Sequence, residues 1–132
     1  MKKSAREWIR YAEADRRGVQ LLGNDPSVRN LVCFHCQQLA EKYLKAVLDQ
    51  LGQPIPKTHD LGKLLAEIAP FYPTVGHLKR GVEFLTDFAV DARYPGGRLN
   101  KRQVETALRW AERIRLECRT LLGLKPPRPK KT

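Results

Sequence analysis

The sequence predicts an all-α fold, an antiparallel up-and-down bundle of four long helices and one short helix. Apolar residues recur at intervals of three and four along most of the 132-residue chain, which is the helical period. Clusters of Pro and Gly interrupt this period, and no stretch alternates apolar and polar residues for long enough to predict a strand. Because short connections favour antiparallel neighbours, we expect one bundle around one core.

The first two helices are expected on either side of a turn at residues 23–26, which holds Gly, Asn, Asp and Pro. The first runs from Ala5 to about Leu22, where apolar residues keep the helical spacing. Ser27 is expected to cap the second helix, which continues to Leu51 ahead of a Gly- and Pro-rich connection.

Three further helices complete the expected bundle. A short helix is predicted over residues 60–68, and a longer one over residues 76–92. Asn100 is expected to cap the fifth helix, whose apolar face comprises Val104, Ala107, Leu108, Ala111, Ile114, Cys118, Leu121 and Leu122. We therefore expect residues 1–124 to form one domain and residues 125–132 to form a flexible, basic, Pro-rich tail.

The chain is strongly basic, with a net charge of +11. The charge is uneven, because residues 98–132 hold eleven Lys or Arg and only three Glu. This asymmetry favours an anionic partner such as RNA, a nucleotide or an acidic protein, although a high charge also serves solubility alone.

The sequence gives no sign of a membrane or a metal site. No apolar run approaches the roughly 20 residues of a membrane span, and no apolar signal segment follows Met1, so we expect a cytoplasmic protein. Cys33 and Cys36 flank His35, but the other candidate zinc ligands are distant. We therefore predict reduced thiols, no metal and no cofactor.

The second helix has two contrasting faces. Its apolar arc is assigned to the core: Val32, Cys33, Cys36, Leu39, Ala40, Tyr43, Leu44, Val47 and Leu51. The opposite face carries His35, Gln38, Lys42 and Lys45 beside Leu31 and Phe34. Such a mixture of cation, amide, imidazole and aromatic ring suits a phosphate and a stacked base. The alternative is a solvated face on which Glu41 and Lys45 pair.

Three polar blocks together carry a family resemblance. They read Cys-Phe-His-Cys-Gln-Gln-Leu-Ala-Glu-Lys-Tyr-Leu-Lys-Ala at residues 33–46, Thr-His-Asp-Leu at 58–61 and Ala-Arg-Tyr-Pro at 92–95. In this order the blocks resemble the HEPN domain, named for higher eukaryotes and prokaryotes nucleotide-binding. The resemblance implies a helical bundle that binds a nucleotide or RNA and forms a homodimer. It also implies a small nucleotidyltransferase as a partner, in pairs of the toxin–antitoxin kind.

The resemblance and the residue chemistry together give an expected nucleotide-binding set: Gln38, Lys42, Lys45, His59, Arg93 and Tyr94. The cations and the imidazole would contact phosphate, the Gln38 amide would hydrogen bond, and the Tyr94 ring would stack. Structural readings stay open for the shorter blocks. Thr58 and Asp60 are also helix-capping residues, and Arg93 also offsets the dipole at a helix end.

A metal-independent ribonuclease toxin is the enzyme alternative. Some HEPN proteins carry an Arg followed by His after four to six residues, and Arg29 and His35 have this form. His would transfer a proton and Arg would stabilise the phosphorane. On a regular helix, however, the two side chains point about 120° apart, and the motif usually lies in a later helix. Whether the chain is an enzyme stays open.

The fifth helix carries a basic stripe of Arg102, Arg109 and Arg113 opposite its apolar face. The stripe predicts contacts with RNA phosphates or an acidic partner, against the simpler reading of a solvated face. A third hypothesis for the whole chain is a purely structural bundle that holds a partner protein.

Overall fold

A computed structural model describes residues 1–92 and 99–124. The described chain is helical, which confirms the predicted all-α fold. Its elements are α1 (Lys3–Leu22), η1 (Pro26–Val28), α2 (Arg29–Gln50), α3 (Leu61–Ile68), η2 (Pro73–Leu78), α4 (Lys79–Ala92) and α5 (Lys101–Leu121). Arg93, Tyr94 and the predicted tail at residues 125–132 lie outside the described residues.

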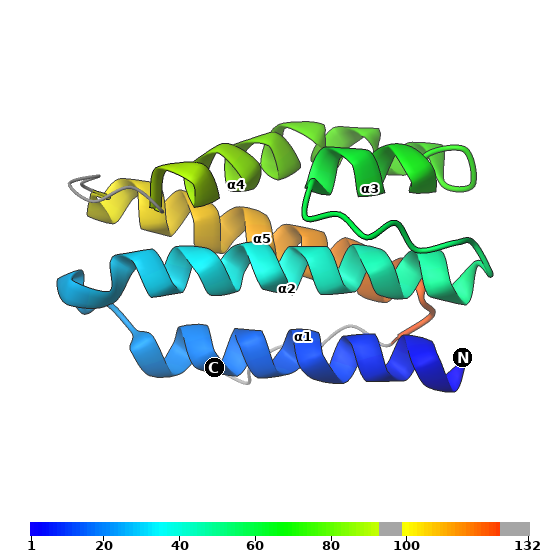
Figure 1. Cartoon of the computed structure of the whole chain (residues 1–132), viewed down its shortest axis with the longest axis horizontal. Helices are drawn as coiled ribbons and strands as arrows, with labels where there is room; N and C mark the ends of the chain where they lie inside the picture. The colour runs from blue at the N-terminus through cyan, green and yellow to red at the C-terminus, as the bar shows by residue number, and fades with distance from the viewer. Residues whose placement is uncertain (93–98, 125–132) are drawn as a thin grey trace, which may run out of the picture.

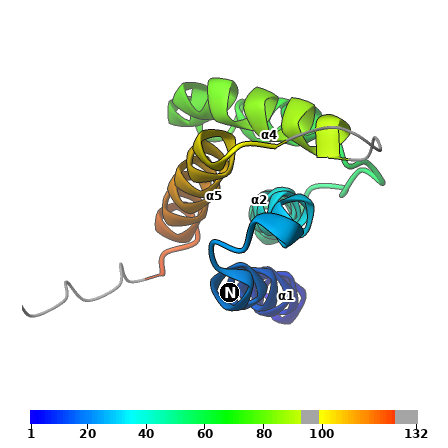
Figure 2. The same ribbon diagram turned by 90° about the vertical axis from the view of Figure 1, so that its left-hand side faces the viewer.

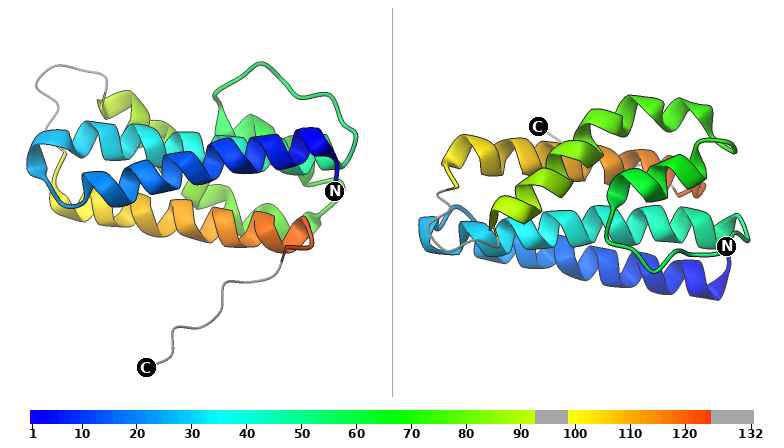
Figure 3. Two further views of the ribbon diagram at one scale, coloured as in Figure 1. Left: turned by 90° about the horizontal axis from the view of Figure 1, so that it is seen from below. Right: turned by 45° about the horizontal axis from the view of Figure 1, so that its top comes forward.

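Helix α2 lies in the middle of the bundle and packs against α1, α3, α4 and α5. The chain runs up and down, so that α2 and α5 point one way while α1 and α4 point the other (Figure 1). Seen along the bundle, α1 lies on the far side of α2 from α4 (Figure 2). The views in Figure 3 also show α1 alongside α2 over its whole length. The bundle thus gives α2 neighbours on most sides and leaves α1 at its periphery.

The core follows from this arrangement. Its largest fully buried side chains include Tyr43, Leu44 and Leu48 of α2, Leu61 and Leu64 of α3, Leu85 of α4 and Ile114 of α5. The whole predicted apolar arc of α2 is buried except Leu51, which is half-buried. Burial of these side chains is the main driving force for assembling the helices.

The helix ends show which capping predictions were right. The Asn100 side chain accepts a hydrogen bond from the Gln103 backbone N–H, and Gln103 returns one, which confirms the cap of α5. Ser27 does not cap α2, because the Asp25 side chain accepts from the backbone N–H of Ser27 and starts η1 instead. Helix α4 begins at Lys79 rather than residue 76, because η2 takes up the residues after Pro73.

No helix within the described ranges is both long enough and apolar enough to cross a membrane.

The contact between α4 and α5 depends on a glycine. A Cβ atom placed on Gly81 would lie 2.2 Å from the Trp110 ring. The ring therefore occupies the space that any larger residue would need, and Trp110 in turn lies 5.3 Å beneath the Arg113 guanidinium.

We expect Gly81→Ala to lower the free energy of unfolding by about 1–3 kcal/mol, because the indole must move out of a packed site. Urea denaturation measures this loss. Gly76→Ala is the matched control, since a Cβ there meets nothing within 4 Å. Equal stability of the two variants would contradict the packing argument.

Candidate functional site

The polar face of α2 and its borders are partly covered rather than fully solvated. Gln37, Glu41 and Lys45 are all buried. Helix α1 covers one side of α2, and the connection at residues 51–60 runs back along the other (Figure 1). Buried polar and charged groups need partners. Gln37 hydrogen bonds to the backbone of His59, and Glu41 and Lys45 pair with each other.

One polar cluster joins α1 to the middle of α2. The Asp15 carboxylate accepts from the Lys42 ammonium at 2.5 Å and lies 2.8 Å from His35 Nδ1. Asp15 is buried, whereas the side chains of Lys42 and His35 keep 22% and 31% of their exposure. Two predicted site residues, Lys42 and His35, thus contact the same buried carboxylate and are themselves partly exposed to solvent. Sequence reasoning did not select Asp15.

A second polar cluster joins α2 to the connection before α3. The Glu41 carboxylate pairs with the Lys45 ammonium at 3.1 Å and with His59 Nδ1 at 2.8 Å. The Gln37 amide donates to the His59 backbone carbonyl, and the Lys45 ammonium lies 5.6 Å from the Trp8 ring centre. Lys45 is therefore buried with its charge paired to Glu41, while the His59 ring is 73% exposed.

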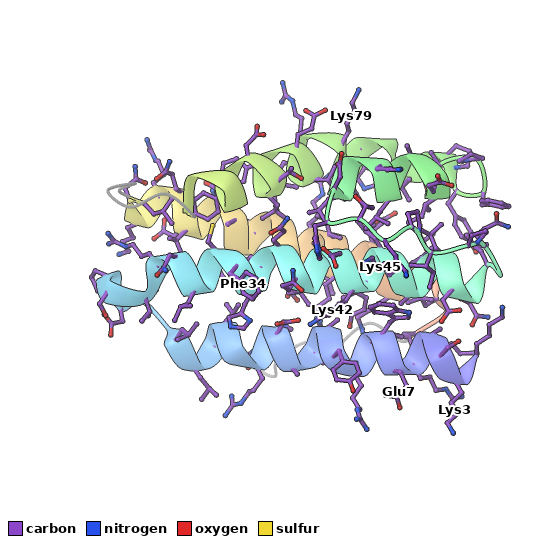
Figure 4. All side chains as sticks on the ribbon, viewed as in Figure 1. Lys3, Glu7, Phe34, Lys42, Lys45 and Lys79 are labelled. Carbon is purple, nitrogen blue, oxygen red and sulfur yellow. The ribbon has the colours of Figure 1, made fainter. Side chains whose placement is uncertain are left out.

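Phe34 and Gln38 extend the first cluster along the surface of α2. The Phe34 ring is 49% exposed and meets the His35 ring edge-on at 5.4 Å. The Gln38 amide, one turn further on, makes no hydrogen bond within the described part of the chain. Figure 4 shows Phe34, Lys42 and Lys45 in sequence along the helix. An aromatic ring, an amide and a cation therefore share one partly exposed strip of α2.

Arg29 and His35 do not share partners. The Arg29 guanidinium donates to the Leu99 backbone carbonyl at 3.2 Å, near the start of α5, whereas His35 engages Asp15 of α1. The other two predicted contacts, Arg93 and Tyr94, lie outside the described residues, so their position relative to this strip stays a prediction.

The predicted basic stripe of α5 is exposed. Arg102, Arg109 and Arg113 all face solvent, with Arg109 donating to the Thr106 hydroxyl at 3.3 Å. Arg113 lies over the Trp110 ring. None of the three forms an ion pair with the described carboxylates, so their charges stay open to an anionic partner.

A third charged cluster, absent from the sequence predictions, joins α1 to α5. Arg115 is buried and donates two hydrogen bonds to the Glu13 carboxylate, at 2.9 and 2.8 Å, and one to Glu112. The Tyr43 hydroxyl donates to Glu13 as well. Asp15 and Arg115 each lie three or four residues from buried apolar residues of the same helix, so they belong to its core-facing side. A charged residue at such a position in the sequence could have indicated a buried ion pair.

This cluster shifts the pKa values of its members. Burial raises the pKa of Glu13, but hydrogen bonds from Arg115 and Tyr43 outweigh it, so the net value lies below the ordinary 4.5. Burial also raises the pKa of Tyr43 to about 12, which keeps its hydroxyl protonated as a donor. The Glu13 hydrogen bonds raise the pKa of Arg115. The charged forms of Glu13 and Arg115 are therefore favoured in the fold.

The cysteines belong to the core. Cys33, Cys36 and Cys118 are buried, and burial raises the pKa of Cys36 to about 12. Within residues 1–92 and 99–124, no group of three or more His, Cys, Asp or Glu is arranged to hold a metal ion.

We expect Glu13→Gln to destabilise the protein at pH 7 by about 2 kcal/mol, because Arg115 loses its charged acceptor. A carboxyl with a lowered folded pKa stabilises the fold above its unfolded value and loses that contribution as the pH falls through the folded value. The gap to wild type should therefore narrow from pH 5 towards about pH 3. Urea denaturation across this range measures it. Glu7→Gln, at an exposed pair with Arg10, should show no such gap; an equal gap would contradict the assignment.

The fold and the family are both supported by comparison with known proteins. A family model described as HEPN domain matches residues 5–121. The crystal structure of TT1696 from Thermus thermophilus superposes with a TM-score of 0.75 at 24% identity, covering 91% of this chain and 99% of that one. At this identity the likeness shows a shared fold. No curated protein matches the sequence. Because the family model spans most of the chain and confirms the resemblance in the three polar blocks, this chain belongs to the HEPN domain family.

Proposed function

We propose that this chain is a HEPN module that binds a nucleotide or RNA and acts with a small nucleotidyltransferase partner in a system of the toxin–antitoxin kind. Family membership supports a nucleotide- or RNA-related role. The observation that carries the proposal is the strip on α2 where Phe34, half-exposed, adjoins His35 and leads to Gln38 and Lys42.

The strip has the dimensions of a nucleotide. Phe34 and Lys42 are eight residues apart, about 12 Å along a helix axis. A base stacked on Phe34 places its sugar near Gln38 and its phosphates near Lys42, and stacking on an aromatic ring tolerates any base. The Gln38 amide then hydrogen bonds to the ribose or to a base edge.

The other predicted residues have supporting parts in this proposal. His59 contacts phosphate through its exposed ring, while Lys45 holds Glu41, which in turn orients His59 through Nδ1. Arg93 and Tyr94 add a cation and a stacking ring, as the family resemblance implies. The exposed Leu31 side chain also fits the proposed homodimer, which would cover apolar surface beside the strip.

Lys42→Ala should weaken the binding of AMP or a short single-stranded RNA roughly tenfold, because a charge-assisted contact with phosphate is lost. Calorimetry or fluorescence anisotropy measures the affinity. Lys79→Ala removes the same charge from an exposed position on α4, away from the strip (Figure 4), and should leave affinity unchanged. Equal affinities of both variants and wild type would refute the assigned strip.

The α5 stripe should act through its charge alone. Replacing Arg102, Arg109 and Arg113 by Ala should lower the slope of log affinity against log salt by about 2 for single-stranded RNA, since each lost phosphate contact accounts for roughly 0.7. Replacing the exposed Lys3, Lys63 and Lys79 by Ala is the control with the same change in charge. A slope that falls equally in both triple variants would assign the effect to net charge.

A metal-independent ribonuclease is the second candidate, and one observation favours it. Asp15 engages His35 through Nδ1, and a carboxylate in that place fixes the imidazole for proton transfer through Nε2.

Cleavage of tRNA in EDTA that is lost in His35→Ala and Arg29→Ala would establish the ribonuclease activity. Intact RNA with all proteins folded would favour the binding module. Failure to bind AMP or RNA as well would leave the structural bundle that holds a partner protein.

A further inference from the structure

Helix α1 is attached to the bundle by half-buried apolar side chains together with several charged contacts. Its buried residues are Ala5, Ala12 and Asp15. Two of these are alanines, which bury little apolar area, so no large apolar side chain of this 20-residue helix is fully buried. Trp8, Ile9, Val19 and Leu22 add half-buried apolar contacts.

The polar attachments of α1 described above use two cations and one imidazole of the bundle. Asp15 holds Lys42 and His35, and Glu13 holds Arg115. The carboxylates of α1 therefore occupy hydrogen-bond donors on Lys42, His35 and Arg115 that an anionic ligand could otherwise use. Of these groups, Lys42 and His35 belong to the strip proposed to bind nucleotide and remain partly exposed beside the carboxylate.

The Asp15 carboxylate has the contacts of a bound phosphate. One oxygen lies 2.8 Å from His35 Nδ1, and the other accepts from Lys42 Nζ. A phosphate group presents oxygens of the same kind to the same two donors. One ammonium and one imidazole cannot serve both anions at full strength, so a phosphate at Lys42 and His35 must compete with Asp15.

We propose that Asp15 is a resident anion that a terminal phosphate, on a mononucleotide or an RNA end, displaces from Lys42 and His35, and that its displacement loosens α1. This inference rests on the proposed nucleotide site. A terminal phosphate is favoured over an internal diester because it carries about −1.5 to −2 charges rather than one. It also reaches donors that lie recessed between two helices more easily than a chain backbone does. Helix α1 is thus an autoinhibitory strap.

The test compares AMP with adenosine, by calorimetry, on wild type, Asp15→Asn and Glu7→Gln. Asn keeps the shape of the side chain and removes its charge, so AMP affinity should rise about tenfold in Asp15→Asn. Adenosine affinity should stay unchanged, because it has no phosphate. Glu7→Gln removes one charge from an exposed place on the same helix and should not raise AMP affinity (Figure 4).

Three outcomes overturn the inference. AMP affinity that falls or stays constant in Asp15→Asn, while Lys42→Ala still weakens binding, leaves the nucleotide site intact and shows that Asp15 only positions its neighbours. AMP binding that is undetectable in wild type and Asp15→Asn removes both proposals, whereas binding that is insensitive to Lys42→Ala removes the proposed site itself.

Hydrogen exchange on the unaltered protein decides the matter if Asp15→Asn fails to fold. Saturating AMP should make the amides of α1 exchange faster than saturating adenosine does, because α1 has lost its attachment at Asp15. Exchange in α1 that slows or stays the same with AMP overturns the strap, since a ligand that leaves α1 in place protects it.

Discussion

The pairing of charges around α2 is the constraint on which the rest of the structure depends. A helix in the middle of a bundle has neighbours on most sides, yet α2 carries Glu41, Lys42 and Lys45. Burying an unpaired charge costs several kcal/mol, so each of these residues must meet an opposite charge. Asp15 meets Lys42, and Glu41 meets Lys45 while its other oxygen contacts the exposed ring of His59; these contacts fix how α1 and the connection before α3 lie against α2.

The cations on α2 and those on α5 can thus be separated by whether a carboxylate neutralises them. Lys42 and Lys45 on α2 are held within ion pairs and have fixed positions, which suits recognition of one group at one place. The arginines exposed on α5 have no partner carboxylate among the described residues and act over a distance. A nucleic acid would contact the α5 arginines through its overall negative charge and the α2 lysines through one defined phosphate.

The sequence predicted the helices better than it predicted the site. Apolar periodicity and the Asn100 cap located α5, because both signals are local. Ser27 was misplaced as a cap because Asp25, two residues earlier, accepts from its backbone N–H and starts a separate turn. The burial of Lys45 was missed for another reason: a helical wheel reveals an apolar arc but not how many neighbours the helix has. The number of neighbours is a property of the whole bundle.

The burial of the cysteines has a consequence for handling and for observing this protein. The thiolate is the reactive form of a cysteine, and burial raises the pKa values of Cys36 and Cys118 far above neutrality. Alkylating reagents and oxidants therefore reach these sulfur atoms only when helices separate. The rate of thiol modification in the native protein accordingly reports how often the bundle opens, without any introduced label.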